Sequence, residues 1–340
     1  MDGYVPGEQP RDRRYIKLNT NENPYPPSPH VLEAVRTAAT EDLRLYPDPA
    51  ATELRAKASE VYGVGADGIV AGNGSDDLLT MLFRACVADG DGTVAYPTPT
   101  YSLYRTLAQI QGAVPVTVPY PSDFALPVDA LVAKKARLTI ACSPNAPSGT
   151  AVPLDAIRDL ARRAAGLVVI DEAYVDFARE TALSLLPACP NLLVLRTFSK
   201  SFSLAGMRIG LAFTSPDIAA QLNKVKDSYN LDRVSLAAAR AALDDYAWME
   251  RNVGKVRTAR DELVAELRGL GFRVLPSDAN FVFAESPTHG GEELYLALRA
   301  AGILVRYFPQ EDLRRGVRIT IGTPDDHRAL VAALRALAVR

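Results

Sequence analysis

The sequence predicts an α/β protein with a mostly parallel, seven-stranded sheet, helices on both faces of that sheet, and a second, smaller α+β domain. Short, continuously apolar runs bounded by turn residues alternate with amphipathic helical segments, as is typical of parallel strands covered on both faces. After residue 271 the pattern changes to short strands with two helices. The chain has 340 residues, more than one hydrophobic core usually supports, which also favours two domains.

The elements of the first domain follow in order along the chain. Six prolines in the first thirty residues predict an extended arm, because proline lacks the amide donor of a helix or inner strand. Apolar residues from Val31 to Ala39, three or four apart, predict a helix that ends before Tyr46. The predicted strands are residues 68–70, 93–96, 114–118, 138–142, 167–170, 192–196 and 209–213. The helices predicted between them include residues 75–87, 101–111 and 154–165.

The last two of these strands are predicted to be antiparallel, because only about a dozen residues separate them, too few for a helical crossover. A long helical stretch at residues 236–270, broken near Asp244 and Asp245, leads to the second domain. There the predicted strands are residues 272–275, 281–285, 304–308 and 318–321, and the predicted helices are residues 292–300 and 324–338.

Composition excludes several classes of protein. The formal net charge of -2 leaves no basic excess for a nucleic-acid backbone, and no apolar run approaches the ~20 residues of a membrane helix. The polar N-terminus lacks the apolar core of a signal peptide. Three widely spaced cysteines argue against a disulfide framework and indicate a reducing cytoplasm. Three histidines without metal-ligand spacing predict no metal site.

A glycine-rich turn at residues 71–77 follows the first predicted strand of the sheet and opens a helix. Glycine permits a tight turn and the helix N-terminus presents free amides, so Gly74, Ser75 and Asp76 would form a cup for an anion or a phosphate. The turn lacks the Lys-Ser/Thr pair of a nucleotide P-loop and the third small residue of a dinucleotide fingerprint. By itself it is equally consistent with a helix that Ser75 simply caps.

Two further turns follow predicted strands at the same edge. Asn145 lies between Pro144 and Pro147 and can donate its amide to a ligand oxygen, although a rigid turn also explains this segment. Asp171 ends an apolar strand, where a carboxylate requires a metal, an arginine or a protonated ring nitrogen as its partner. Tyr174 can offer its hydroxyl to the same ligand. Alternatively, Asp171 caps the N-terminus of a helix.

Lys200 differs in its surroundings from the other lysines of the chain, because it follows a buried strand and precedes a phenylalanine. A desolvated lysine has a lowered pKa and becomes a nucleophile that can form a Schiff base. Arg208, eight residues later, can return to the same edge and clamp a phosphate. Since a lone lysine is usually exposed, this interpretation depends on the other three motifs.

A pyridine aldehyde phosphate would use all four motifs. The lysine would form an imine, the aspartate would keep the ring nitrogen protonated so that the ring draws electrons, and the arginine would clamp the phosphate. Asparagine and tyrosine side chains would bind the ring hydroxyl, and a further tyrosine would stack on the ring. The residues that would bind this group are Gly74, Ser75, Asp76, Tyr101, Asn145, Asp171, Tyr174, Ser199, Lys200 and Arg208.

Eight motifs spread over nearly the whole chain carry a resemblance; they are residues 4–7, 18–25, 46–48, 72–75, 143–145, 171–174, 199–202 and 318–322. Jointly they resemble the fold-type I pyridoxal-phosphate aminotransferases, and among these most closely the histidinol-phosphate aminotransferases. The resemblance implies pyridoxal 5′-phosphate as the cofactor and a homodimer with active sites at the subunit interface. It also implies a large cofactor-binding domain at residues 31–235 and a small domain at residues 236–340 that the arm, residues 1–30, joins.

The resemblance further implies roles for individual residues. Lys200, Asp171 and Tyr174 would be catalytic, with Lys200 both imine partner and base. Tyr46 would reach the cofactor phosphate of the other subunit, and Arg318 would bind the acidic group of the substrate. The residues implied to bind substrate are Tyr4, Asn19, Asn23, Arg306 and Arg318.

The implied reaction moves the amino group of histidinol phosphate to 2-oxoglutarate, giving imidazole acetol phosphate and glutamate, a step of histidine biosynthesis. Alternatives stay open, because residues 227–230 read Asp-Ser-Tyr-Asn where many members have Pro-Pro-Tyr-Asn near the substrate entrance. One alternative is transamination of aromatic or other amino acids, and another is decarboxylation, as in threonine-phosphate decarboxylases. A non-catalytic, cofactor-binding regulator is disfavoured by the intact Lys200.

Overall fold

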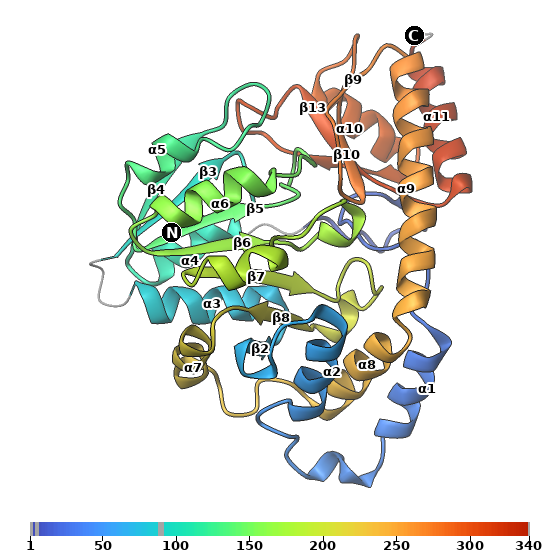
Figure 1. Cartoon of the computed structure of the whole chain (residues 1–340). Coiled ribbons are helices and arrows are strands. Elements are labelled where there is room, and N and C mark those ends of the chain that lie inside the picture. Colours follow the sequence, from blue (N-terminus) through green and yellow to red (C-terminus); the bar gives the residue numbers. More distant parts are fainter. Residues whose placement is uncertain (1–2, 4–6, 88–91, 339–340) are drawn as a thin grey trace.

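The computed structural model describes residues 3, 7–87 and 92–338. Figure 1 shows a main sheet with helices on both sides and a second group of strands and helices beside it. The long helix α9 (Tyr246–Gly269) runs along one side of the molecule, from the second group to α8 (Arg233–Asp244). These two helices confirm the predicted helical stretch and its break at Asp245.

The main sheet has seven strands in the order β2-β8-β7-β6-β5-β3-β4. All of them run in one direction except β8, which is antiparallel to both β2 and β7. The predicted fold class and the predicted antiparallel pair are therefore confirmed. The strands are β2 (Ile69–Gly72), β3 (Thr93–Thr98), β4 (Val114–Pro119), β5 (Leu138–Cys142), β6 (Leu167–Asp171), β7 (Leu192–Thr197) and β8 (Gly210–Phe213).

The apolar composition of the central strands follows from their place in the sheet. All five residues of β5 and all six of β7 are buried, because each strand has neighbours on both sides and helices on both faces. The edge strand β4 differs, since Val114 is exposed and Pro115 and Pro119 interrupt the row of amide donors.

Helices cover the two faces of the main sheet and give two apolar clusters. One face packs against α3 (Ser75–Cys86), α4 (Leu103–Ile110) and α7 (Pro216–Val225), with Phe83 and Leu107 among the buried side chains. The other face packs against α2 (Thr52–Tyr62), α5 (Val128–Val132), α6 (Leu154–Arg163) and α8. Alternate strand residues point to opposite faces, so Val70 joins the first cluster and Ile69 the second.

The second group of elements is the predicted smaller α+β unit. Its antiparallel sheet has the order β12-β13-β10-β9, and a separate short parallel pair joins β1 (Ile16–Lys17) to β11 (Ile303–Leu304). Its other elements are β9 (Arg273–Val274), β10 (Phe281–Glu285), α10 (Gly291–Ala300), β12 (Arg306–Tyr307), β13 (Gly316–Thr320) and α11 (Pro324–Ala338). The domain boundaries at residues 30 and 235 stay a prediction, which the pairing of β1 with β11 supports.

The first helix is shorter than the sequence predicted. Helix α1 (Pro29–Ala38) begins at a Ser28 side chain that accepts from the His30 amide, with proline at the first helical position. It ends at Ala38, and Thr40 caps a separate 3-10 turn at Glu41–Arg44. Thr40 is extended, so the α-helix cannot continue through it.

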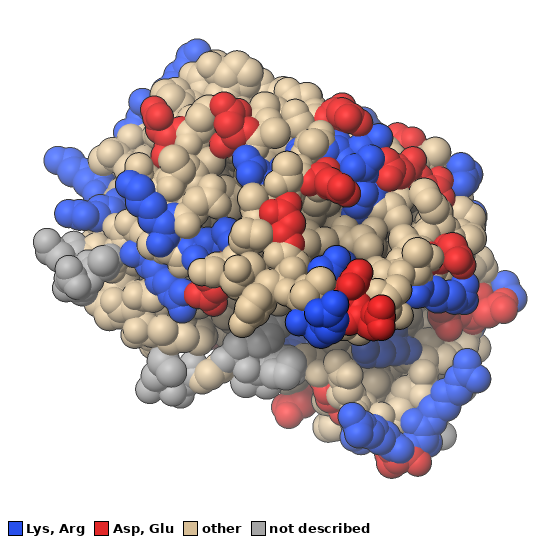
Figure 2. Space-filling view, turned by 90° about the horizontal axis from the view of Figure 1, so that it is seen from below, with Lys and Arg blue, Asp and Glu red and all other residues tan. Residues whose placement is uncertain are grey.

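The surface carries both signs of charge. On the face of the molecule shown in Figure 2, acidic and basic side chains are both spread over the surface. In the part of the chain that the structure describes, no helix is long and apolar enough to cross a bilayer.

Candidate active site

The turns that carry the predicted site residues meet at one edge of the main sheet. Strand register aligns Cys142 with Asp171 across β5 and β6. It also aligns Gly72 and Thr197 with Gly210, the first residue of β8. Because β8 is antiparallel, its beginning lies at the edge where its neighbours end. Arg208 therefore returns to the edge that Lys200 occupies, as the sequence predicted.

The glycine-rich turn and Arg208 form one cup at the start of α3. Gly74 has φ +82° and precedes the first helical residue, Ser75. The Arg208 guanidinium lies 3.3 Å from the Ser199 hydroxyl (Nη1 to Oγ) and 3.2 Å from the Asp76 carboxylate (Nη2 to Oδ2). The N-cap residue of α3 is Gly74 and Ser75 is already the first helical residue, so the alternative of a Ser75 cap is wrong. Free helix amides and a guanidinium together suit a phosphate.

Asp171 is the last residue of β6, and its side chain is buried. Its Oδ2 accepts a hydrogen bond of 2.7 Å from the Tyr104 hydroxyl, and its Oδ1 accepts one of 3.2 Å from the Ala173 amide. Burial raises the pKa of Asp171 to about 6, while these hydrogen bonds and the charge of Lys200 act in the opposite direction. Above that pH the group is a buried anion, which suits a protonated ring nitrogen as its partner.

Lys200 lies just beyond β7 and is largely withdrawn from solvent. Its Nζ donates to the Thr20 carbonyl over 3.3 Å and lies 5.8 Å from the centre of the Tyr174 ring. Burial, and after it the positive charge of Arg318, lowers the pKa of Lys200 to about 8. An amine with this pKa has a substantial neutral fraction near neutral pH, as a nucleophile requires.

Tyr174 and Tyr101 hold their predicted places at the sheet edge. The Tyr174 hydroxyl accepts from the Asn21 amide over 3.1 Å, and burial raises the pKa of this phenol. The Tyr101 hydroxyl donates to Asp76 Oδ1 over 3.2 Å, and its ring meets the Tyr104 ring edge-on at 5.6 Å.

Asn145 uses its side chain within its own turn. Its amide nitrogen donates to the Pro99 carbonyl over 3.1 Å and to the Ser148 hydroxyl over 3.0 Å. Its carbonyl oxygen accepts from the Thr100 hydroxyl over 2.7 Å. These contacts agree with the rigid-turn alternative, and the role of Asn145 toward a ring hydroxyl stays a prediction.

The N-terminal arm lies over the lysine. Asn23 donates its side-chain amide to the backbone carbonyls of Lys200 and Ser201, each over 3.1 Å. Asn19 donates its amide to the Glu8 carbonyl over 2.9 Å. In this structure Asn23 therefore stabilises the backbone of the lysine turn, and Asn19 stabilises that of the arm.

Arg306 and Arg318 face each other in the second sheet. They are direct partners in the antiparallel register of β12 and β13, so their side chains lie on the same face. Both guanidinium carbons lie near the Phe308 ring centre, at 5.5 and 5.4 Å, and Arg318 Nη2 donates to the Asn19 carbonyl over 3.1 Å. This arginine pair is thus connected to the arm that contacts Lys200.

Tyr46 stands apart from these groups. Its side chain is 77% exposed and stacks on the Tyr229 ring, with centroids 4.3 Å apart. Tyr4 lies outside the described residues.

Comparisons with known proteins agree with this geometry. The family model "Aminotransferase class I and II" matches residues 13–334. The chain belongs to this aminotransferase family. It is 47% identical over 338 residues to histidinol-phosphate aminotransferase 1 of Trichormus variabilis, covering 99% of this chain and 96% of the relative. It is 48% identical over 338 residues to the histidinol-phosphate aminotransferase of Citrifermentans bemidjiense, with the same coverage.

A solved structure is similar to this aminotransferase over almost its whole length. It is the histidinol-phosphate aminotransferase of Sinorhizobium meliloti in complex with pyridoxal-5′-phosphate, with a TM-score of 0.88 and 28% sequence identity. The likeness covers 96% of this chain and 92% of that chain. The chain is therefore a pyridoxal-phosphate-dependent aminotransferase of fold type I, as its motifs predicted.

The residues of the aminotransferase fit that cofactor. A Cβ at Gly74 would stand 2.6 Å from Arg208 Nη2, so the backbone there is free to approach a phosphate only because it is glycine. The buried carboxylate of Asp171 and the amine of Lys200 would suit the two other functions that a pyridine aldehyde requires. When bound, the cofactor supplies an aldehyde and an electron-withdrawing ring.

Two residues of the aminotransferase site escaped the sequence analysis. Tyr104 bonds Asp171, but as a buried aromatic on an amphipathic helix it resembles an ordinary core residue; its place one turn after Tyr101 was the available signal. Asn21 donates its side-chain amide to Tyr174, and its backbone amide donates to the Thr320 hydroxyl. The only signal for Asn21 was its place between the predicted Asn19 and Asn23.

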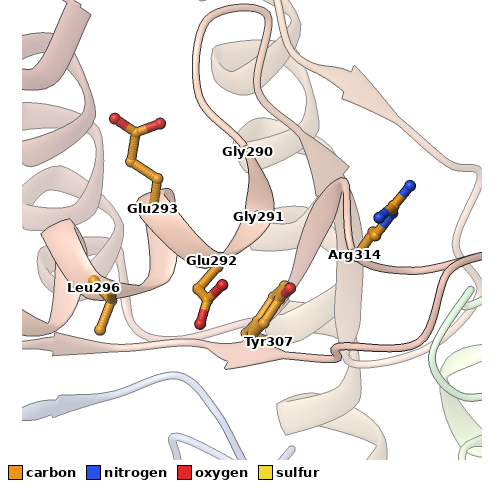
Figure 3. Close-up of a pocket in the computed structure, with 7 residues that line it drawn as sticks. All are labelled: Gly290, Gly291, Glu292, Glu293, Leu296, Tyr307 and Arg314. Atoms are coloured by element: carbon orange, nitrogen blue, oxygen red, sulfur yellow. The ribbon is translucent and has the colours of Figure 1, made fainter.

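A hollow of about 500 Å³ lies elsewhere, in the smaller unit (Figure 3). Its lining comes from the start of α10, from Tyr307 of β12 and from Arg314. Two carboxylates, Glu292 and Glu293, contribute to it, and they oppose the binding of a phosphate. The strand-end cluster around Lys200, and not this hollow, is the candidate active site.

Proposed function

We propose that this aminotransferase transfers the amino group of histidinol phosphate to 2-oxoglutarate and releases imidazole acetol phosphate and glutamate. The names of its relatives at 47% and 48% identity support this substrate. The reaction alternates between two halves, with the amino group held on the enzyme between them. We also propose that the enzyme is cytoplasmic. Cys86, Cys142 and Cys189 are unpaired, as is usual in a reducing compartment.

The observation that carries this proposal is the pair Arg306 and Arg318. The two guanidinium groups lie on the same face of one sheet, an arrangement that suits an anionic ligand. A phosphate takes two guanidinium groups, whereas an uncharged aromatic side chain requires none. The positive charge of Arg318 also lowers the pKa of Lys200. The proposed anion site would therefore lie near the reacting amine.

The residues of the site divide the work. We assign to Lys200 Nζ the covalent hold on the cofactor aldehyde and the transfer of a proton between substrate carbon and cofactor carbon. We propose that Asp171 keeps the ring nitrogen protonated and that Asn145 and Tyr174 bind the ring hydroxyl. The remaining cofactor contacts are assigned to Gly74, Ser75, Asp76, Tyr101, Ser199, Arg208 and the partner's Tyr46, and the substrate contacts to Tyr4, Asn19, Asn23, Arg306 and Arg318.

A homodimer is part of the proposal. Leu43, Leu45 and Tyr46 are exposed in a short segment, with exposed fractions of 57%, 47% and 77%. Tyr229, itself 47% exposed, extends the same surface by stacking on Tyr46. Large apolar side chains gathered in this way mark an interface. A second copy placed there would carry Tyr46 toward the partner's site.

The test is a half-reaction panel. Purified holoenzyme is mixed in turn with histidinol phosphate, phenylalanine, aspartate and threonine phosphate, and the cofactor absorbance is followed. The proposal expects histidinol phosphate to convert the cofactor fastest, and an Arg306→Gln variant to lose this preference selectively. Faster conversion by phenylalanine would overturn the substrate in favour of an aromatic aminotransferase. Release of carbon dioxide from threonine phosphate would instead indicate a decarboxylase.

A further inference from the structure

Tyr104 connects the helical layer of the main sheet to the carboxylate of Asp171. It lies on α4, one turn after Tyr101, and its side chain is fully buried. The hydroxyl reaches Asp171 Oδ2 over 2.7 Å, the shorter of the two hydrogen bonds that hold this carboxylate. Edge-on contacts with the rings of Tyr96 and Tyr101, at 5.9 and 5.6 Å, fix the phenol in place.

The direction of this hydrogen bond is determined by chemistry. Burial and the neighbouring charge of Asp171 raise the pKa of Tyr104 well above its ordinary value, so the phenol stays protonated and donates. A donor stabilises the carboxylate more than the neutral acid, because the bond is charge-assisted. Burial acts against it by raising the pKa of Asp171. The titratable and charged groups that face this pair are Asp76, Cys142, Tyr174 and Lys200.

We propose that Tyr104 is a positioning residue of the transamination: its hydroxyl keeps Asp171 ionised and aimed at the ring nitrogen of the cofactor. This inference rests on the role assigned to Asp171 in the proposed function. Tyr104 acts only through that carboxylate. Its loss weakens the hold on the ring proton without removing any group that contacts the cofactor.

The chain offers a matched control in Tyr96. Its hydroxyl is buried and makes no hydrogen bond within the part of the chain that the structure describes. Its ring packs edge-on against Tyr104, in the same apolar cluster. Tyr96→Phe therefore removes a buried hydroxyl from the same layer but leaves Asp171 untouched, so it reports any effect of repacking alone.

The experiment follows the ring proton directly. Holoenzymes of the parent, Tyr104→Phe, Tyr96→Phe and Asp171→Asn are loaded with pyridoxal phosphate labelled with ¹⁵N in the ring, and the ¹⁵N resonance is recorded against pH. In Tyr104→Phe the ¹⁵N resonance is expected to move toward that of an unprotonated ring across the pH series, because the pKa of Asp171 rises when it loses this donor and the carboxylate then draws the ring proton toward itself. The kcat near pH 7 is expected to fall about tenfold, with the KM of the amino donor changed by less than about twofold.

The outcomes separate the two claims. A parent-like titration in Tyr104→Phe, with the proton absent in Asp171→Asn, would overturn the role of Tyr104 and leave that of Asp171 standing. A ring nitrogen that stays protonated in Asp171→Asn would reject the role of Asp171 and with it this inference. An equal shift in Tyr96→Phe would assign the effect to packing and reject the inference. Should Tyr104→Phe fail to fold, 4-aminophenylalanine at position 104, a weaker donor, is expected to give a smaller shift of the same sign, and no shift would overturn the proposal.

Discussion

The Arg208 guanidinium lies directly against Gly74, with its Nη2 2.6 Å from the place that a Cβ on residue 74 would take. Gly74 has φ +82° and ψ 168°, a backbone conformation that only glycine adopts readily. Glycine is therefore required at position 74 for two reasons: its backbone has a positive φ, and a Cβ would collide with the Arg208 guanidinium.

Gly74→Ala is expected to displace Arg208 and to weaken cofactor binding by about tenfold or more, because one charge-assisted contact to the phosphate is lost. It should also cost about 1–3 kcal/mol of folding stability from backbone strain. Equilibrium titration with pyridoxal phosphate and thermal unfolding measure the two effects. Gly63→Ala is the control, since Gly63 also has positive φ (+68°) but has nothing within 4 Å of its Cβ position. A similar loss of cofactor affinity in both variants would contradict the explanation.

Lys200→Ala is expected to abolish the yellow absorbance of the covalent link to the cofactor while the protein stays folded. No other amine is assigned to that link. The spectrum is recorded after free cofactor has been removed by gel filtration, and circular dichroism reports the fold. The exposed lysine Lys255 provides the control, because Lys255→Ala should keep the colour. Colour that persists in Lys200→Ala would rule out this lysine as the anchor.

The rate at which cofactor-free protein captures pyridoxal phosphate should rise with pH and level off above about 8. The protonated amine cannot attack an aldehyde, and burial lowers the pKa of Lys200 from 10.5 to about 8. At pH 7 about a tenth of the amine is then neutral, compared with about one part in three thousand for an ordinary lysine. Stopped-flow absorbance between pH 6.5 and 9.5 measures this profile. A rate that keeps climbing to pH 9.5 would contradict the lowered pKa.

Arg318→Gln is expected to raise the KM of the amino donor by about 10- to 100-fold, the usual loss when a charged hydrogen bond to an anion is removed. Cofactor affinity should change much less, because Arg318 is assigned to the substrate. The same variant should move the midpoint of the cofactor-capture profile to higher pH, since a neighbouring positive charge that lowers the pKa of Lys200 is gone. Equal losses of substrate and cofactor affinity would reject the assignment.

Leu45→Glu is expected to shift the protein toward a monomer in sedimentation, because a charge is costly at an apolar interface. Cofactor affinity should fall with it, as the partner's Tyr46 leaves the site. Leu296, which is 56% exposed on α10, supplies the control substitution Leu296→Glu. An unchanged sedimentation profile for Leu45→Glu would show that the segment around Tyr46 is not the interface.

Local pattern was sufficient to predict most of the main sheet. The antiparallel place of β8 followed from the short connection after Arg196, because chain length alone forbids a helical crossover. Helices α2 and α7 were not predicted. Helix α2 buries only Leu54 and Ala58, so its polar and apolar residues give little periodic contrast.

Contacts between distant segments explain what the sequence could not supply. Lys200 and Asp171 were predictable because Asp171 ends one apolar strand and Lys200 lies shortly after the next, and parallel strands bring their ends to one edge. The bonds of Asn21 to Tyr174 and of Asn23 to the lysine turn span 153 and 177 positions. No periodic pattern encodes such pairings, because they depend on how the arm lies across the finished fold.

The arm also has a temporal consequence. Residues near Asn21 leave the ribosome long before their partners, because the Asn21 backbone amide donates to Thr320, 299 positions later, and the Asn19 carbonyl accepts from Arg318. At ordinary synthesis speeds of about 5–20 residues per second, that wait lasts roughly 15 to 60 seconds. Once Lys200 has been made, a nascent or prematurely released fragment holds Asp171 and the arm as well, but it lacks Arg318 and Thr320, to which the arm is bonded. Synthesis must therefore pass residue 320 before the enzyme can close its substrate side.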